Sequence, residues 1–321
     1  MRNLTIFLFF LALLCISPFI GAVPLDLQNI LNPSHLQYQI FFEIRLPRVL
    51  VAFSAGALLA LGGLVFQALF RNDLMTPYTL GISSGAVLGT GIAIKLGLTS
   101  LFFGLSLVSV FGFSGAMASL FVLLYLARFL DRSHKESLLL LGIALSLFFT
   151  AALMILFFLG NSVQNDMILH FTMGSLAILG WHNPLLLSFA LLFTLLLLYV
   201  YRFDLQLITI SEESAKLRGV ATKQTTHILL ISFSITTGVL VSITGPIGFV
   251  GLVVPHIVSK LYPVGIQKRI GKTALFGGFF LLFCDTIARS ISFGSEVPIG
   301  IVTALIGGPF FIYLILLKKG V

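Results

Sequence analysis

Long apolar segments alternate with short polar connections along most of this chain. After an apolar run at 4–22 and a polar connection at 24–48, further apolar runs lie at 49–70, 78–97, 101–127, 137–159 and 184–201. A helix of about 20 apolar residues crosses the hydrocarbon core of a bilayer, so each run is long enough for one span. The pattern therefore predicts an all-α, polytopic membrane protein. We expect the first run to be an uncleaved span, because it is longer than the apolar region of a signal peptide.

The next apolar stretch, at 226–262, is too long for a single span. Gly245-Pro246 lies near its middle and is a turn signal, so we expect it to divide the stretch into two spans. Two more apolar runs, at 273–292 and 297–317, follow. The chain is therefore expected to contain about ten transmembrane helices.

The positions of the positive charges test this count and orient the chain. Ten spans with a cytosolic N-terminus leave four of the 19 Lys and Arg residues outside, namely Arg45, Arg48, Lys95 and Arg289. Treating 226–262 as one span would move several more of them outside. We therefore expect a single transmembrane domain over residues 1–321, with both termini in the cytosol.

Composition agrees with a membrane protein and excludes other classes. Hydrophobic residues make up 58% of the chain and charged residues only 9%, compared with about 25% charged in soluble domains. The net charge of +8 follows from the positive residues on the cytosolic side, so we expect no nucleic-acid partner. The two cysteines lie far apart in apolar runs, which gives no indication of a disulfide framework.

A short charged segment at 211–219 lies in the longest predicted cytosolic connection, at about 203–224. Ser211 is suited to cap a helix and Gly219 to end one, and Glu212 and Lys216 have the spacing of an i,i+4 ion pair. So short a helix is not stable alone. We expect the membrane domain or a cytosolic partner to hold it. Its candidate functional residues are Ser211, Glu212, Glu213, Lys216, Leu217, Arg218 and Gly219.

No pattern indicates catalysis, and we expect no catalytic residue. The segment at 265–273 resembles a phosphate-binding loop, but it has five residues between its glycines where four are needed, and it follows no strand. We expect neither a nucleotide nor a metal on this chain, because the histidines lack the spacing of metal ligands. These are His35, His134, His170, His182, His227 and His256.

Charged residues at the membrane leave two questions open. Asp285 lies well inside a predicted span, which would suit a proton-coupled secondary transporter. Arg289 follows four residues later, so a local ion pair is the other interpretation. Arg45 and Arg48 lie on the outer side; they either anchor the chain at the interface or, with Arg289, form a positive rim that binds an acidic partner.

Several short motifs are spread over the chain from about residue 45 to 319. They are Arg-Leu-Pro-Arg at 45–48, Phe-Gln-Ala-Leu-Phe-Arg-Asn at 66–72, Leu-Gly-Ile-Ser-Ser-Gly-Ala at 80–86, Leu-Arg-Gly-Val at 217–220, Gly-Pro-Ile-Gly-Phe-Val-Gly-Leu-Val-Val-Pro-His at 245–256, Asp-Thr-Ile-Ala-Arg at 285–289 and Pro-Ile-Gly-Ile-Val-Thr-Ala-Leu-Ile-Gly-Gly-Pro-Phe-Phe at 298–311. In their order and spacing, they resemble the permease subunits of ABC importers for iron-siderophores, haem and vitamin B12.

This resemblance implies a ten-helix permease of the bacterial inner membrane, surrounded by lipid and paired with a second copy or a paralogue. ABC ATPase subunits would bind ATP and Mg²⁺, so this chain itself would hold no cofactor. An extracytoplasmic binding protein would deliver the substrate, an iron-siderophore or a related metal chelate.

The resemblance also implies roles for particular residues. The segment at 211–219 would couple the permease to the ATPase, and Arg45, Arg48 and Arg289 would receive acidic residues of the binding protein. Asn72 and Leu74 would narrow the cytosolic end of the pore. The family has Asn-Pro-Leu at that turn, whereas this chain has Asn-Asp-Leu.

Overall fold

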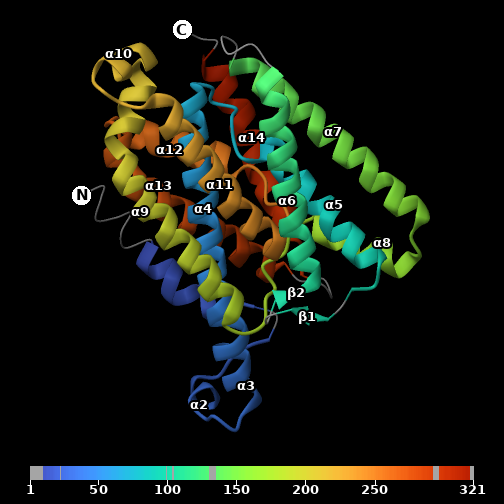
Figure 1. Cartoon of the computed structure of the whole chain (residues 1–321). Helices are drawn as coiled ribbons and strands as arrows, with labels where there is room; N and C mark the ends of the chain where they lie inside the picture. Colours follow the sequence, from blue (N-terminus) through green and yellow to red (C-terminus); the bar gives the residue numbers. More distant parts are fainter. Residues whose placement is uncertain are drawn as a thin grey trace.

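The computed structural model describes residues 10–21, 23–98, 100–102, 105–129, 135–291 and 296–318 and shows a bundle of packed helices (Figure 1). The main helices are α4 (Leu46–Phe70), α5 (Ile82–Lys95), α6 (Leu107–Leu126), α7 (Lys135–Leu159), α9 (His182–Ile210), α11 (Thr222–Thr244), α12 (Val250–Leu261), α13 (Ile266–Ser290) and α14 (Ile299–Lys318). The shorter elements are η1 (Ser17–Phe19), α2 (Leu27–Ile30), α3 (Leu36–Gln39), η2 (Ile40–Arg45), η3 (Tyr78–Leu80), β1 (Leu101–Phe102), β2 (Leu105–Ser106), η4 (Ala127–Phe129), α8 (Ser162–Thr172) and α10 (Glu212–Leu217).

Membrane-spanning character is confirmed for this all-α chain. Within the described ranges, six helices are long and apolar enough to cross a membrane, and four shorter apolar helices accompany them. The exact number of crossings and the side of each terminus remain predictions. The predicted first span begins in residues 4–9, which, like residues 319–321 at the other end, lie outside the described part of the chain.

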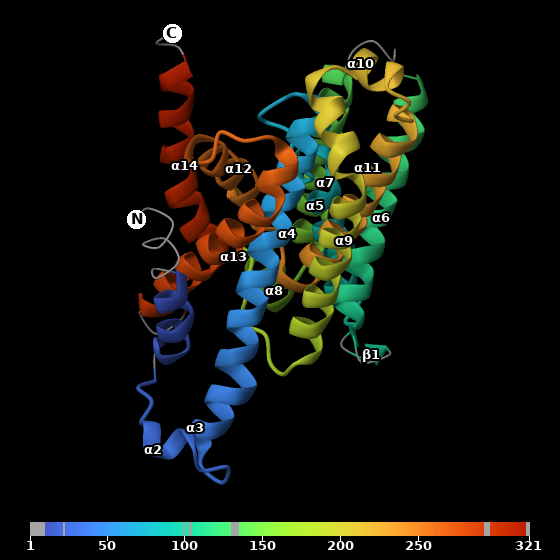
Figure 2. The ribbon, with the colours of Figure 1, turned by 90° about the vertical axis from the view of Figure 1, so that its left-hand side faces the viewer.

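Helix α4 forms the centre of the bundle (Figure 2). It packs most extensively against α13 and α9, with α12 as a further neighbour, and 89% of its most apolar stretch is buried. Glycines make this packing possible: a Cβ on Gly56 would lie 2.2 Å from the carbonyl oxygen of Gly277, and one on Gly63 would lie 1.8 Å from that of Gly251. Membrane helices approach so closely only where small residues meet.

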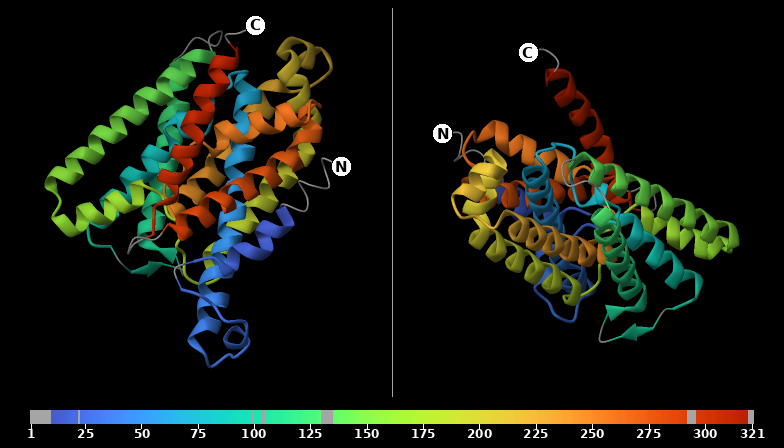
Figure 3. Two further views of the ribbon diagram at one scale, coloured as in Figure 1. Left: turned by 180° about the vertical axis from the view of Figure 1, so that it is seen from behind. Right: turned by 45° about the horizontal axis from the view of Figure 1, so that its top comes forward.

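The outer helices of the bundle present apolar faces away from the core. Helix α7, green in Figure 3, lies at the edge of the molecule, and only 17% of its most apolar stretch is buried. In water such a face would be unstable, but lipid tails are as apolar as the leucine side chains they contact. The face of α7 is therefore suited to lipid or to another membrane subunit.

The predicted break at Gly245-Pro246 is confirmed, since α11 ends at Thr244 and α12 begins at Val250. Gly245 has a φ of 68°, which costs glycine little. Phe249 also has a positive φ, 66°, which is unusual for a residue with a Cβ. A Cβ on Gly307 of α14 would lie 2.3 Å from the Phe249 Cβ, so Phe249 and α14 are in close contact.

The predicted span at 101–127 begins too early, which is a correction to the sequence analysis. Strands β1 and β2 form a short antiparallel hairpin there, with Leu101 opposite Ser106. The Ser106 hydroxyl then accepts a hydrogen bond from the Val108 N–H at 3.3 Å and caps α6. A capping side chain at this position starts the helix after the hairpin.

Two connections predicted as polar loops also contain helices. In the connection at 160–183, Asn161 and Gln164 form a capping box that starts α8. In the connection at 24–48, the short helix α2 forms first, and from Leu36 the chain is helical without a break into α4. The turn before Pro47 is π-helical, which accommodates a residue that has no N–H to donate.

The two ends of the bundle carry different segments. Helices α2 and α3 project from one end, and α10 lies at the opposite end (Figure 1). Following the topology predicted from the charges, we call these the outer end and the inner end.

The close contact between α4 and α12 leads to a stability prediction. Gly63→Ala places a methyl group against the Gly251 carbonyl and should destabilise the protein by about 1–3 kcal/mol, the usual cost of overpacking. Gly271→Ala is the matched control, because nothing lies within 4 Å of a Cβ there; improved helix propensity should stabilise that variant by up to about 1 kcal/mol. Thermal unfolding in detergent measures both, and equal melting temperatures would contradict the packing described here.

Candidate functional site

A buried carboxylate joins α4 to α13 at the outer end. Asp285 lies 2.9 Å from Nη2 of Arg48 through its Oδ1 and 3.0 Å from Nε of Arg289 through its Oδ2. The Asp285 side chain is fully buried. Both of its oxygens are therefore committed to arginines from two different helices.

Arg289 and a third arginine, Arg45, hold the end of the first apolar helix. Arg289 donates to the Ile20 carbonyl at 3.1 Å and to the Ser17 hydroxyl at 2.8 Å. Arg45 donates to the carbonyl oxygens of Pro18 and Phe19 at 3.1 and 3.0 Å, and also to that of Val23. These bonds satisfy carbonyl groups that the end of a helix leaves without partners.

Glu296, in the connection before α14, completes the group. Its Oε2 lies 2.6 Å from Nη1 of Arg48, and its side chain is 43% exposed. We call Arg45, Arg48, Asp285, Arg289 and Glu296 the outer charge cluster. Three cations face two carboxylates, so the cluster carries one excess positive charge.

The three arginines named in the sequence analysis therefore lie together, but they do not form an open rim. Arg45, Arg48 and Arg289 are only 6%, 5% and 3% exposed. The i,i+4 pair of Asp285 with Arg289 is confirmed, and Arg48 extends it. Both oxygens of Asp285 face arginines, so the structure gives no support to a proton-carrying role for Asp285.

At the inner end, the segment at 211–219 forms the helix expected from its sequence. The Ser211 hydroxyl accepts a hydrogen bond from the Ser214 N–H at 3.2 Å, and Lys216 Nζ lies 3.3 Å from Glu212 Oε1. Gly219 has a φ of 83°. Helix α10 packs mainly against α9, with Ala215 fully buried. The membrane domain therefore holds this short helix in place.

One face of α10 is left open to solvent. Leu217 is 89% exposed, and the neighbouring Glu213, Lys216 and Arg218 are exposed as well. A large apolar side chain surrounded by charges of both signs is a common feature of surfaces that bind other proteins.

The turn after α4 forms without the proline of the family pattern. The Asn72 side chain accepts a hydrogen bond from the Leu74 N–H at 2.9 Å, an Asx-turn that replaces the stiffness of proline. Asp73, at the proline position, lies 3.7 Å from Nε2 of His256 on α12. Leu74 is 45% exposed, so it is free to contact another subunit.

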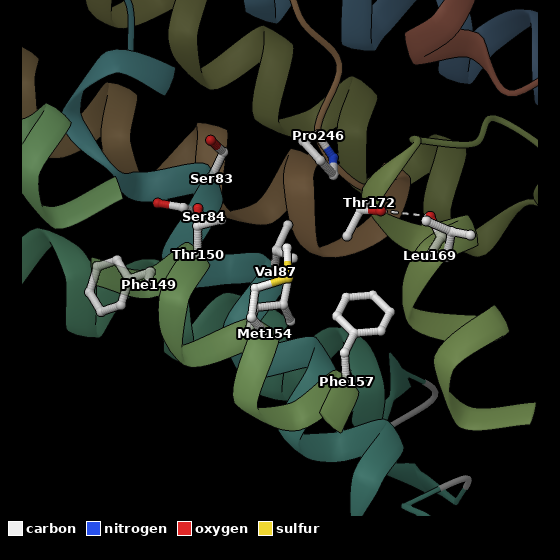
Figure 4. A pocket seen from close by; sticks show the side chains of 11 residues that line it. Ser83, Ser84, Val87, Phe149, Thr150, Met154, Phe157, Leu169, Thr172 and Pro246 are labelled. Carbon is white, nitrogen blue, oxygen red and sulfur yellow. Dashed lines mark hydrogen bonds between the residues drawn. The ribbon is translucent and has the colours of Figure 1, made fainter. Parts of the chain in front are cut away.

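A cavity of about 510 Å³ opens between α5, α7 and α8 (Figure 4). Its wall is mainly apolar, with hydroxyl groups from α5, α7 and α8. The lining residues are Ser83, Ser84, Val87, Phe149, Thr150, Leu153, Met154, Phe157, Leu169, Thr172 and Pro246. Ligand sites in proteins commonly have this volume and this mixture of apolar wall and few polar groups.

No group of three or more His, Cys, Asp or Glu residues suited to a metal ion occurs in the described part of the chain. His134, one of the six histidines of the sequence analysis, lies outside that part. The segment at 265–273 forms the start of α13, with Gly265 at its N-cap. It therefore has the backbone of a helix, not of a phosphate-binding loop.

Comparison with known proteins decides the family. The sequence profile of the FecCD transport family matches residues 7–317. This chain belongs to the FecCD transport family. It is a multi-pass protein of the bacterial inner membrane and a permease subunit of an ABC transporter.

Individual relatives cover most of this FecCD permease. It is 38% identical to the ABC transporter permease protein YvrB of Bacillus subtilis, over 87% of this chain and 79% of YvrB. It is 36% identical to the hemin transport system permease protein HmuU of Yersinia pestis, over 93% and 90% of the two chains. A solved structure of a metal-chelate type ABC transporter in an inward-facing conformation matches with a TM-score of 0.82 at 30% identity, covering 97% of this chain and 98% of that one.

The sequence analysis missed three contributors to these sites. Glu296 was not considered, although it is the only acidic residue after Asp285, which was a usable signal. Arg45 binds main-chain carbonyl oxygens, which every residue has, so no residue type in the sequence indicates these contacts. The cavity depends on how α5, α7 and α8 pack, which the sequence of any one helix does not indicate.

The shared carboxylate leads to a prediction about coupling between residues. Asp285→Asn leaves two buried arginines without the carboxylate that they share and should destabilise the FecCD permease by about 3–5 kcal/mol. Arg289→Gln in the same chain removes one of these charges, so the double variant should be more stable than the sum of the two single effects by about 1 kcal/mol or more.

A double-mutant cycle from chemical unfolding in mixed micelles measures this coupling. Arg71→Gln, at the inner end of α4, is the control partner for Asp285→Asn, and that pair should be additive within about 0.5 kcal/mol. Additive effects for Asp285 and Arg289 would contradict the shared ion pair.

Proposed function

We propose that this chain is the membrane-spanning subunit of an ATP-driven importer that moves a metal chelate, with an iron-siderophore as the preferred class, into the cytosol. The main support is that two polar sites, the outer charge cluster and α10, lie toward opposite ends of the helix bundle (Figure 1). The outer charge cluster is suited to a soluble acidic partner, and α10 is suited to a cytosolic one. Family membership and the haemin and metal-chelate relatives support the substrate class.

The proposed ATPase contact is centred on α10. Its Leu217 would enter an apolar groove of the ATPase, with the charges of Glu213 and Arg218 fixing the orientation. Because α10 is anchored on α9 through the buried Ala215, movement of the ATPase would be passed to α9 and the bundle. ATP and Mg²⁺ would be held by the partner, so this chain would bind no cofactor.

The proposed contact with the binding protein is at the outer charge cluster. Its excess positive charge favours an acidic surface, and electrostatic attraction would accelerate the encounter. Arg45 and Arg289 are held mainly by groups of this chain. Arg48 is the arginine whose Nη1 is paired with the half-exposed Glu296, so it is the proposed point at which a docking carboxylate binds.

The proposed substrate path runs along the open face of α7. That face is apolar and mostly uncovered in the single chain, as expected where a second copy or a paralogue adds the other wall. The cavity between α5, α7 and α8 opens in this region, and its apolar wall with scattered hydroxyl groups would tolerate a bulky chelate without binding it tightly. At the inner end, Asn72 and Leu74 would form the gate.

Charge reversal on α10 tests the coupling site. Glu212→Lys combined with Glu213→Lys should abolish ATP-dependent uptake in proteoliposomes and weaken co-purification of the ATPase, while the permease stays folded because both positions face solvent or lie at the helix start. The control combines Glu212→Lys with Lys216→Glu. It keeps an ion pair within α10, so comparing the two variants distinguishes loss of the helix from loss of ATPase docking. Unchanged uptake and co-purification in the first variant would refute the assignment.

Filling the cavity tests the substrate path. Thr150→Trp places a large ring in the cavity wall and should reduce uptake to the level seen without ATP, while assembly with the ATPase is unaffected. Leu196→Trp, at an exposed position of α9 away from α7 and from the cavity lining, is the control and should retain uptake. Equal uptake by both variants would place the path elsewhere.

A further inference from the structure

The two carboxylates of the outer charge cluster hold Arg48 in different ways. Asp285 belongs to α13, is fully buried and uses both oxygens on two arginines. Glu296 lies in the connection before α14 and is 43% exposed. Among the described residues, its side chain contacts the cluster through one hydrogen bond, to Nη1 of Arg48.

Arg48 is therefore paired with a buried carboxylate on one side and with a half-exposed carboxylate on the other. Its Nε and Nη2 are held by Asp285 at 3.0 and 2.9 Å, where no partner protein can reach. Its Nη1 is held at 2.6 Å by Glu296. The charge of Glu296 also acts on Arg45 and Arg289 over a longer distance.

We propose that Glu296 occupies the position of the partner's carboxylate and must be displaced when an acidic side chain of the binding protein docks on Arg48. This inference rests on the proposed docking function of the cluster. Docking is then an exchange of one ion pair for another. Glu296 sets the affinity of the permease for the binding protein and favours partners whose carboxylates compete with it for Arg48.

The exchange has a physical advantage over an empty site. A nearly buried guanidinium nitrogen without a partner is costly, because it loses its hydration without compensation. With Glu296 present, Nη1 of Arg48 has a carboxylate partner both before and after docking. When the binding protein leaves, Glu296 returns to Nη1, which favours release in each transport cycle.

A static structural role for Glu296 makes the opposite prediction. If the pair only positions Arg48 for the partner, removing Glu296 should misplace Arg48 and weaken docking. Competition predicts that removing Glu296 strengthens docking. The direction of the affinity change therefore separates the two roles.

The test uses the complete transporter in nanodiscs and, as the probe, the substrate-binding protein that stimulates its ATP hydrolysis. Glu296→Gln should lower the dissociation constant by about threefold to tenfold, in line with the loss of a half-exposed ion pair, mainly through slower dissociation. Glu296→Ala, which also removes the acceptor oxygen, should give at least as large an effect. Glu43→Gln is the matched control, because it removes an exposed carboxylate that lies two residues from Arg45 in sequence; it should leave the dissociation constant nearly unchanged.

The possible outcomes distinguish this inference from the proposed function. An unchanged or raised dissociation constant in both Glu296 variants, with melting temperatures like that of the parent, overturns the inference. A double variant that combines Arg48→Gln with Glu296→Gln has the same net charge in the cluster as the parent protein. If that double variant binds as tightly as Glu296→Gln alone, docking does not involve Arg48 and the proposed docking site itself fails.

Discussion

A carboxylate without access to water holds the outer end of this protein together. Two arginines, one from α4 and one from α13, lie against the two oxygens of Asp285 and compensate for the water that this buried group has lost. The same arginines reach further: Arg289 holds the end of the first helix, and Arg48 holds the connection before α14. Asp285 and its two arginines thus link α4, the end of the first helix, α13 and the connection that follows α13. Any movement at this end has to preserve that pairing or replace it.

The central helix links this end to the inner one. Helix α4 carries Arg48 near its start and the turn with Asn72 and Asp73 after its end, and glycines on α4 and its neighbours keep it in close contact with α12 and α13. Because these backbones are in close contact, we expect α4 to slide or tilt as a rigid helix and to pass that movement on, rather than to bend locally. The lightly packed elements, α7 at the edge and α10 at the inner end, are the ones left open to other subunits.

Local signals in the sequence predicted much of the fold, and long-range contacts account for what they missed. Apolar run length gave the helices, Gly245-Pro246 gave the break between α11 and α12, and Ser211 with Gly219 gave the limits of α10, because each depends on neighbouring residues only. The pairing of residue 48 with residue 296 depends on how distant helices pack, so no local pattern contains it. Motif order identified the three arginines as a group, but not that carboxylates of the same chain already hold them.

Transport by the reconstituted system is the most direct test of the account. The permease, its ATPase and its binding protein are placed in proteoliposomes, and uptake of a radioactive ferric siderophore or of haemin is followed with and without ATP and a protonophore. We expect uptake to require ATP and to be insensitive to the protonophore, because energy enters through the partner at α10 and Asp285 only balances arginine charge. Uptake that needs no ATP and collapses with the proton gradient would contradict it.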